Sequence, residues 1–111
     1  MITLKKAFIS LPITGLTDEQ IKHNFAKAKK RLEKLGYTVV NSIITTNPKD
    51  MNKYVNPPIW FIGKSLEKLA ECDAAYFCTG WKESRGCKIE HSVAKAYNVP
   101  NIYYEGYKVK E

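Results

Sequence analysis

One segment of the chain combines the residue types that could hold an anion and act on it. Residues 73–90 read, in order, as a short apolar strand, a polar loop containing glycine, and a helix with a carboxylate in its first turns. Ser84, Arg85 and Gly86 lie where that helix should begin, and helix N-termini stabilise anions through their backbone N–H groups and dipole. Glu90 follows directly on the same helix. A carboxylate beside an anion site costs free energy through charge repulsion, which favours a functional role for it. Attack on an electrophilic carbon of a phosphorylated ligand is such a role.

The same residues also have a purely structural interpretation. Ser84 could act only as the N-cap of the helix, because serine is a favoured capping residue. A glutamate in a first helical turn is common because it interacts favourably with the helix dipole. Residue chemistry alone leaves the functional and the structural interpretations open.

A second motif, near the N-terminus, favours the functional interpretation. Residues 10–15 read Ser-Leu-Pro-Ile-Thr-Gly, and residues 80–86 read Gly-Trp-Lys-Glu-Ser-Arg-Gly. Together they resemble the nucleoside 2-deoxyribosyltransferase-like superfamily, in particular its branch of small DUF4406-type domains, which phages and bacteria often encode. The resemblance covers nearly the whole chain, and its C-terminal half rests on Asp73, Gly80, Gly86, Glu90, Ala94 and Pro100.

The resemblance implies a chemistry for Glu90. In the superfamily the matching glutamate attacks the anomeric carbon of a nucleoside or nucleotide and expels the base, and water or a second base then resolves the glycosyl ester. The related deoxynucleotide N-hydrolases carry serine at the position of Ser84, where it holds the 5′-phosphate, whereas transferases of free nucleosides carry aspartate. Ser84 with Arg85 therefore favours a phosphorylated ligand. Trp81 is a candidate for stacking on the base, with a rim or core position as the alternative. The expected ligand-binding residues are Ser10, Pro12, Ile13, Thr14, Gly15, Gly80, Trp81, Ser84, Arg85 and Gly86.

Three positions depart from the pattern of the characterised enzymes. Phe8 stands where they have a tyrosine, Ser65 stands where they have an aspartate that helps to handle the base, and Leu11 replaces a glycine. Losing groups that orient a nucleophile or manage a leaving group can cost ~10²-fold or more each. The alternative to an N-glycosidase or (deoxy)ribosyltransferase is therefore a catalytically idle protein that sequesters or senses a nucleotide.

The net charge of +7 raises the question of nucleic acid as a partner. The basic residues of the first expected helix lie opposite an apolar stripe, which is typical of a solvated polar face on a soluble domain. We therefore expect no specific nucleic-acid partner, although the positive field should attract an anionic nucleotide. The cations of this helix are Lys22, Lys27, Lys29, Lys30, Arg31 and Lys34, and the stripe is Ile21, Phe25, Ala28, Leu32 and Leu35.

Composition predicts one soluble domain over residues 1–111, with a loose tail at 105–111. The 111 residues contain 44% hydrophobic and 26% charged residues and no apolar run near the ~20 residues that a bilayer requires. With no membrane segment or signal peptide in view, we expect a cytoplasmic protein. An odd number of cysteines without C-x-x-C spacing predicts no disulfide framework and no zinc site, and we expect no metal and no cofactor. The resemblance implies a homo-oligomer, with Tyr54, Trp60 and Tyr103 as candidate exposed aromatics for its interface.

Strands and helices alternate along the sequence. Strands are expected at 6–10, 37–40, 74–77 and 99–104, and helices at 18–35, 59–71 and 86–97, with a long loop over 42–57. Thr17 and Gln20 form a capping-box pattern, and Gly36 should end the first helix. This order predicts an α/β flavodoxin-like or Rossmann-like three-layer sandwich, with a parallel sheet of four to five strands in the order 2-1-3-4. The loops after the first and third strands, which carry the two motifs, should then face each other across one crevice.

Overall fold

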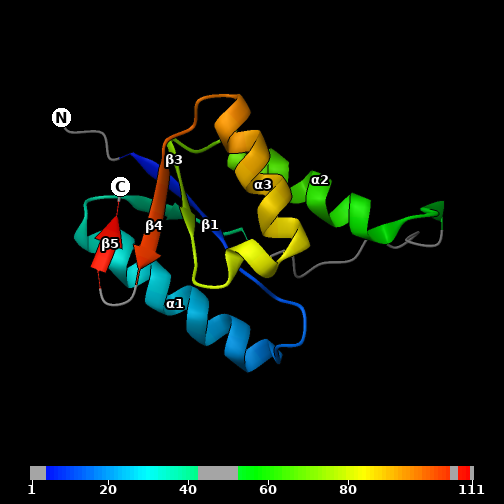
Figure 1. The fold of residues 1–111 in the computed structure, drawn as a ribbon, viewed down its shortest axis with the longest axis horizontal. Helices are drawn as coiled ribbons and strands as arrows, with labels where there is room; N and C mark the ends of the chain where they lie inside the picture. The colour runs from blue at the N-terminus through cyan, green and yellow to red at the C-terminus, as the bar shows by residue number, and fades with distance from the viewer. Residues whose placement is uncertain (1–4, 43–52, 106–107, 111) are drawn as a thin grey trace.

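The computed structural model describes residues 5–42, 53–105 and 108–110 and shows alternating strands and helices (Figure 1). The elements follow the chain in the order β1 (Lys6–Ser10), α1 (Asp18–Lys34), β2 (Thr38–Val40), α2 (Pro57–Leu69), β3 (Ala74–Phe77), the 3-10 turn η2 (Trp81–Glu83), α3 (Arg85–Ala96), β4 (Asn101–Glu105) and β5 (Lys108–Lys110).

The sheet has the order β2-β1-β3-β4-β5. The first four strands in this order are parallel, which confirms the predicted α/β fold and the strand order 2-1-3-4. The expected loose tail is wrong in part, because β5 pairs antiparallel with β4, with Tyr104 opposite Val109. This pairing satisfies backbone groups at the outer edge of β4, which would otherwise face solvent.

Strand alternation divides the core into two layers of side chains, one on each face of the sheet. On one face Ala7, Ile9 and Tyr76 pack against α1 through Ala28 and Leu32. On the other face the core contacts come from β1 and β3 together with α2 and α3, through Phe8, Phe77, Leu69 and Ala94. Figure 1 shows α1 on one side of the sheet and α2 and α3 on the other, which is the predicted three-layer arrangement.

The helix ends follow from local capping chemistry. The predicted capping box of α1 is present, because Thr17 Oγ1 accepts from the Gln20 N–H at 3.1 Å and Gln20 Oε1 accepts from the Thr17 N–H at 2.9 Å. Helix α2 starts two residues earlier than predicted, since Asn56 caps it and Pro57 is suited to a first helical turn. Ile59 is 63% exposed, so the apolar stripe expected on α2 does not extend to its first turn. Most of the loop predicted over 42–57 lies outside the described residues.

Candidate functional site

The centre of the candidate site is a buried hydrogen bond between the two sequence motifs. Ser10, the last residue of β1, donates its hydroxyl proton to Glu90 Oε1 at 2.6 Å. Ser10 is fully buried and Glu90 is 7% exposed. Ser10 lies two positions after Phe8 on β1, so both side chains project to the α3 face of the sheet. The fold therefore places Glu90 at the carboxyl end of a central parallel strand.

A second hydroxyl also reaches Glu90. Burial raises the pKa of the Glu90 carboxyl above its usual value of 4.5, and hydrogen bonds from Ser10 and Ser65 act in the opposite direction. Desolvation is the largest of these effects, so the protonated carboxyl is favoured more than it is in water. Ser65 lies on α2 and stands where the characterised enzymes of the similar superfamily have an aspartate. The sequence analysis did not place Ser65 among the site residues. Its position on the helix face that also carries Ile62, Leu66 and Leu69 was a signal that its hydroxyl faces the protein interior.

The first turn of α3 lies beside this carboxyl. Ser84 is the N-cap of α3, and its Oγ accepts from the Cys87 N–H at 3.3 Å. The structural interpretation of Ser84 is therefore correct as far as capping is concerned. Cys87 is 2% exposed, and burial raises the pKa of its thiol while the hydroxyls of Ser10 and Ser84 act in the opposite direction. Polar side chains thus connect the helix start to Glu90, and Cys87 is a member of the site that sequence reasoning missed.

The two motif loops meet at the same edge of the sheet, as the predicted topology requires. The Cys78 N–H donates to the Ser10 carbonyl oxygen at 3.1 Å. A Cβ at Gly80 would lie 3.7 Å from Pro12 Cγ, and Gly80 has a φ of 90°, which favours glycine. The structure therefore brings Ser10, Pro12, Gly80 and Ser84 close to one another.

The matching family model is the domain of unknown function DUF4406, which matches residues 5–103. The chain belongs to the DUF4406 family. The match includes both motifs, Ser65 and Glu90, so the whole candidate site lies in the family region. No curated protein sequence matches the chain.

Trp81 of this DUF4406 domain has a packing role in the structure. Its ring stacks on His91 with ring centroids 4.2 Å apart, and it also contacts Phe77 and Tyr103. His91 Nε2 is hydrogen-bonded to Tyr103 Oη at 2.8 Å, and burial, followed by the charges of Lys95 and Lys82, lowers the pKa of His91. This aromatic cluster holds η2 against α3. Tyr103 belongs to the cluster and is half-buried, contrary to its expected place among exposed aromatics.

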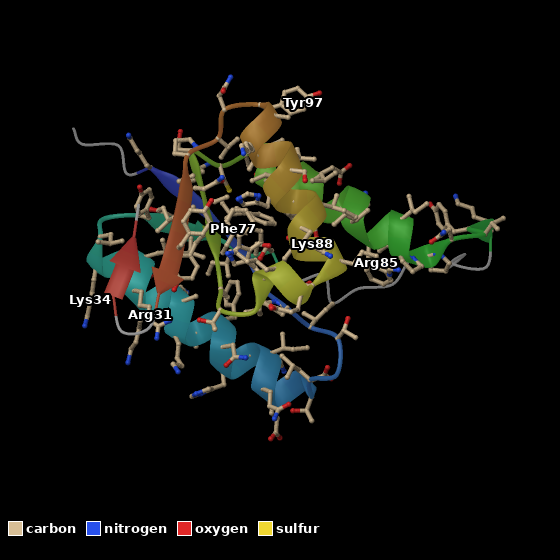
Figure 2. The ribbon with its side chains drawn as sticks, viewed as in Figure 1. Arg31, Lys34, Phe77, Arg85, Lys88 and Tyr97 are labelled. Atoms are coloured by element: carbon tan, nitrogen blue, oxygen red, sulfur yellow. The ribbon has the colours of Figure 1, made fainter. Side chains whose placement is uncertain are left out.

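Four predicted ligand-binding residues of the DUF4406 domain lie away from Glu90 at the surface. Ile13, Thr14 and Gly15 form part of an exposed turn after β1, in which the Leu16 N–H donates to the Ile13 carbonyl oxygen at 3.1 Å. Arg85 is exposed at the start of α3 (Figure 2). Gly86 lies one residue further on and faces α2, since a Cβ there would be 3.9 Å from Ile62 Cδ1. These residues could contact a ligand from the solvent side. The Ser10 and Ser84 side chains, in contrast, already make hydrogen bonds within the protein, Ser10 to Glu90 and Ser84 to the first turn of α3.

The cysteines of the DUF4406 domain are all free thiols. Burial raises the pKa of Cys72 to about 11 and that of Cys78 to about 12, so both thiols are protonated at neutral pH. Among the described residues there is no group of three or more histidine, cysteine or acidic side chains that could hold a metal ion. None of the helices in the described ranges has the length and apolar character needed to cross a membrane.

Proposed function

We propose that this DUF4406 domain binds a nucleoside 5′-phosphate or a related nucleotide and cleaves its N-glycosidic bond, with Glu90 as the nucleophile. The observation that carries the proposal is the Glu90 carboxyl itself, buried and held by the hydroxyl of Ser10 at 2.6 Å. It lies beyond the carboxyl ends of parallel strands, where ligands bind in open α/β sheets. The likeness of residues 10–15 and 80–86 to the nucleoside 2-deoxyribosyltransferase-like superfamily supports the same chemistry.

The reaction has two balanced steps. A Glu90 carboxylate oxygen forms a bond to the anomeric carbon while the glycosidic C–N bond breaks, and the base leaves with the electron pair and takes a proton from solvent. Water, or a second base in a transferase, then attacks the anomeric carbon and returns the free carboxylate, with overall retention of configuration. Glu90 must be ionised to attack. The hydroxyls of Ser10 and Ser65 favour that ionised form against the effect of burial.

The start of α3 is the proposed site of the 5′-phosphate. The first amides of a helix have no intrahelical partner and stabilise anions. Ser84 Oγ accepts a hydrogen bond from the Cys87 N–H, and its single O–H would turn from the Cys87 thiol to a phosphate oxygen when the ligand binds. Arg85, exposed next to it, adds a positive charge. Ser84→Ala or Arg85→Ala should weaken nucleoside monophosphates at least about tenfold more than the matching nucleosides.

A binding-only function is the second candidate, and two observations favour it. Phe8 occupies the position of the expected tyrosine and is 1% exposed within the apolar core, so it offers no hydroxyl to Glu90. Burial raises the pKa of Glu90, which reduces the ionised fraction that could act as nucleophile. A nucleotide could then be held without being cleaved.

The test compares Glu90→Gln with Glu83→Gln, an exposed acid in the same loop region. Each protein is incubated with a panel of nucleotides, base release is followed by chromatography, and binding is followed by thermal stabilisation. We expect the parent and Glu83→Gln to release base and Glu90→Gln to release none, with nucleotide affinity within roughly tenfold of the parent. Base release that persists in Glu90→Gln refutes the mechanism. Stabilisation without base release in the parent selects the binding-only function.

A further inference from the structure

The solvent-facing side of α1 is rich in positive charge. Asp18 and Glu19 lie in the first turn of the helix and Glu33 lies in the last turn, and residues 20–32 between them contain no acidic side chain. All the lysines of α1 are exposed, and we call the surface that they form the α1 lysine face. These residues are Lys22, Lys27, Lys29, Lys30 and Lys34.

The lysines of α1 differ from those of α2 in how their charge is compensated. On α2, Lys64 pairs with Glu67 at 3.2 Å and Lys68 pairs with Glu71 at 4.0 Å, in each case with an acid one helical turn further on. In the part of the chain that the structure describes, no lysine of the α1 lysine face forms an ion pair. Its positive charge is therefore not neutralised in the way that the charge of the α2 lysines is.

The spacing of the α1 lysines brings like charges together. Lys27 and Lys30 are three residues apart, and Lys30 and Lys34 are four apart, so neighbouring cations meet on the helix surface and destabilise it. An anion chain along α1 would relieve this repulsion, because its charges would lie between the cations. Lys27 and Lys34 are separated by about 10 Å along the helix axis. Over that length one strand of a duplex presents about three phosphates.

The remaining features of α1 distinguish between kinds of polyanion. Ala28 and Leu32 are buried in the core, so α1 has no free apolar face to insert into a membrane, as interfacial amphipathic helices do. Phe25 is the only phenylalanine, tyrosine or tryptophan of α1, and it packs against the same core layer. The helix therefore offers no such ring on which the bases of a single strand could stack. A row of cations alone fits the phosphate backbone of a duplex.

A second group of exposed cations, at the start of α3, is less suited to a phosphate backbone. Arg85 and Lys88 lie there between the exposed acid Glu83 and the 40% exposed Ile89 in the sequence. Figure 2 shows Lys34 on α1 and Lys88 on α3 on separate sides of the molecule, so the two basic groups can be tested separately.

We propose that the α1 lysine face binds the phosphate backbone of a nucleic-acid duplex without reading its base sequence. Arg31 is not part of this surface, since its Nη1 donates to the hydroxyl of the buried Tyr76 at 3.3 Å. Backbone binding of this kind comes from counterion release and needs no contact with the bases. It is therefore compatible with the expectation that the chain has no specific nucleic-acid partner. The proposal does not depend on cleavage by Glu90.

The experiment measures the fluorescence anisotropy of a labelled mixed-sequence DNA duplex, and of one of its single strands, titrated with the protein at about 50 to about 200 mM salt. Lys30→Met/Lys34→Met is compared with Lys64→Met/Lys68→Met, which changes the net charge equally but removes lysines that are paired with acids. At about 50 mM salt, duplex affinity should fall at least about tenfold in the first pair and stay within about threefold in the control pair. The slope of log K against log salt should become smaller by about two in the first pair, because each lost phosphate contact removes about 0.9 from it.

Several results would overturn this assignment. Equal losses in both pairs would mean that only the net positive charge attracts the duplex. A single strand that binds more tightly than the duplex would point to base stacking elsewhere on the molecule. A larger loss in Arg85→Met/Lys88→Met than in Lys30→Met/Lys34→Met would assign the duplex to α3. Vesicles of anionic phospholipid that bind through Lys30 and Lys34, with no duplex binding at about 50 mM salt, would make the partner a membrane surface.

A second measurement keeps the test valid if the double variant does not fold. The ¹⁵N-labelled parent protein is titrated with the same duplex, and the amide shifts are followed. We expect the largest shifts along α1, at and around Lys30 and Lys34. Shifts confined to α2 or α3 would contradict the proposal, whatever the variants do.

Discussion

The two sides of the sheet's carboxyl edge offer a ligand opposite environments. On the α3 side, Glu90 is 7% exposed and surrounded by hydroxyls, a thiol and apolar core. On the α1 side, Lys27 and Arg31 line an open pocket together with the apolar side chains of Leu11 and Leu16. The difference begins with strand alternation, because Ser10 turns toward α3 and its neighbour Leu11 turns toward α1.

Two places at the same edge of the sheet therefore give their charged side chains different environments. Desolvation dominates on the α3 side and raises the pKa of a carboxyl. On the α1 side the lining cations Lys27 and Arg31 lie closer to solvent, where salt screens their charge.

The largest expected effect concerns the packing that builds the α3 side. Phe77 is 1% exposed and contacts Trp81, His91 and Tyr103. Phe77→Ala should lower the free energy of unfolding by about 3–5 kcal/mol, because it leaves a cavity under α3. Ile13→Ala, in the exposed turn after β1, should change it by less than about 0.5 kcal/mol. Urea denaturation measures both, and similar values for the two variants would mean that the α3 side is not the more tightly packed one.

The next effect concerns Ser10. Ser10→Ala removes the hydroxyl that donates to Glu90, so we expect base release to fall ~10²-fold while the fold is kept. Ser42→Ala is the control, since Ser42 Oγ donates to the Ile9 carbonyl oxygen at 2.7 Å on the same strand, and among the described residues it makes no hydrogen bond to Glu90. Single-turnover assays on both variants measure the difference. An equal fall of base release in both variants would mean that the loss comes from a disturbance of β1 and not from the missing hydrogen bond to Glu90.

Much of this fold could be predicted because the apolar runs are unambiguous. Residues 6–10 and 74–77 form strands over the predicted ranges, and the capping box at Thr17 marks the start of α1. The strand β5 could not be predicted, because three residues carry too short a pattern and their pairing depends on the edge left open by β4.

The candidate site could be predicted in outline and not in detail. The meeting of Ser10 with the Glu90 helix followed from topology, since carboxyl ends of parallel strands share one edge. The contacts of Ser65 and Cys87 depend on how α2 and α3 rotate against the sheet, which periodicity does not determine. Trp81 was compatible with stacking on a base or with packing, and in this structure its ring stacks on the His91 ring.

A smaller effect concerns the pH dependence of stability, to which the buried Glu90 on the α3 side contributes. The folded-state pKa of Glu90 is raised above its usual 4.5, so its contribution to stability is fully present below about pH 4.5 and is lost as pH rises through the folded value. Denaturation of the parent and of Glu90→Gln from about pH 4 to about pH 8 should show the parent losing stability relative to the variant as pH rises. Ser10→Ala should enlarge this loss, because the Ser10 hydrogen bond lowers the pKa. A constant difference between parent and Glu90→Gln would contradict the desolvation of Glu90.

The smallest expected effect tests the α1 side through Tyr76. Tyr76 is fully buried, and its hydroxyl accepts from Arg31 Nη1 at 3.3 Å. Tyr76→Phe keeps the ring and removes the hydroxyl that accepts this hydrogen bond, and the loss of such a bond costs about 0.5–1.5 kcal/mol of stability.

Urea denaturation of Tyr76→Phe beside Phe77→Ala compares the two sides of the sheet. The loss for Tyr76→Phe should be the smaller one, because this variant keeps the apolar volume of the buried ring and leaves no cavity. A loss as large as that of Phe77→Ala would mean that the Tyr76 hydroxyl stabilises the α1 side as much as the Phe77 ring stabilises the α3 side.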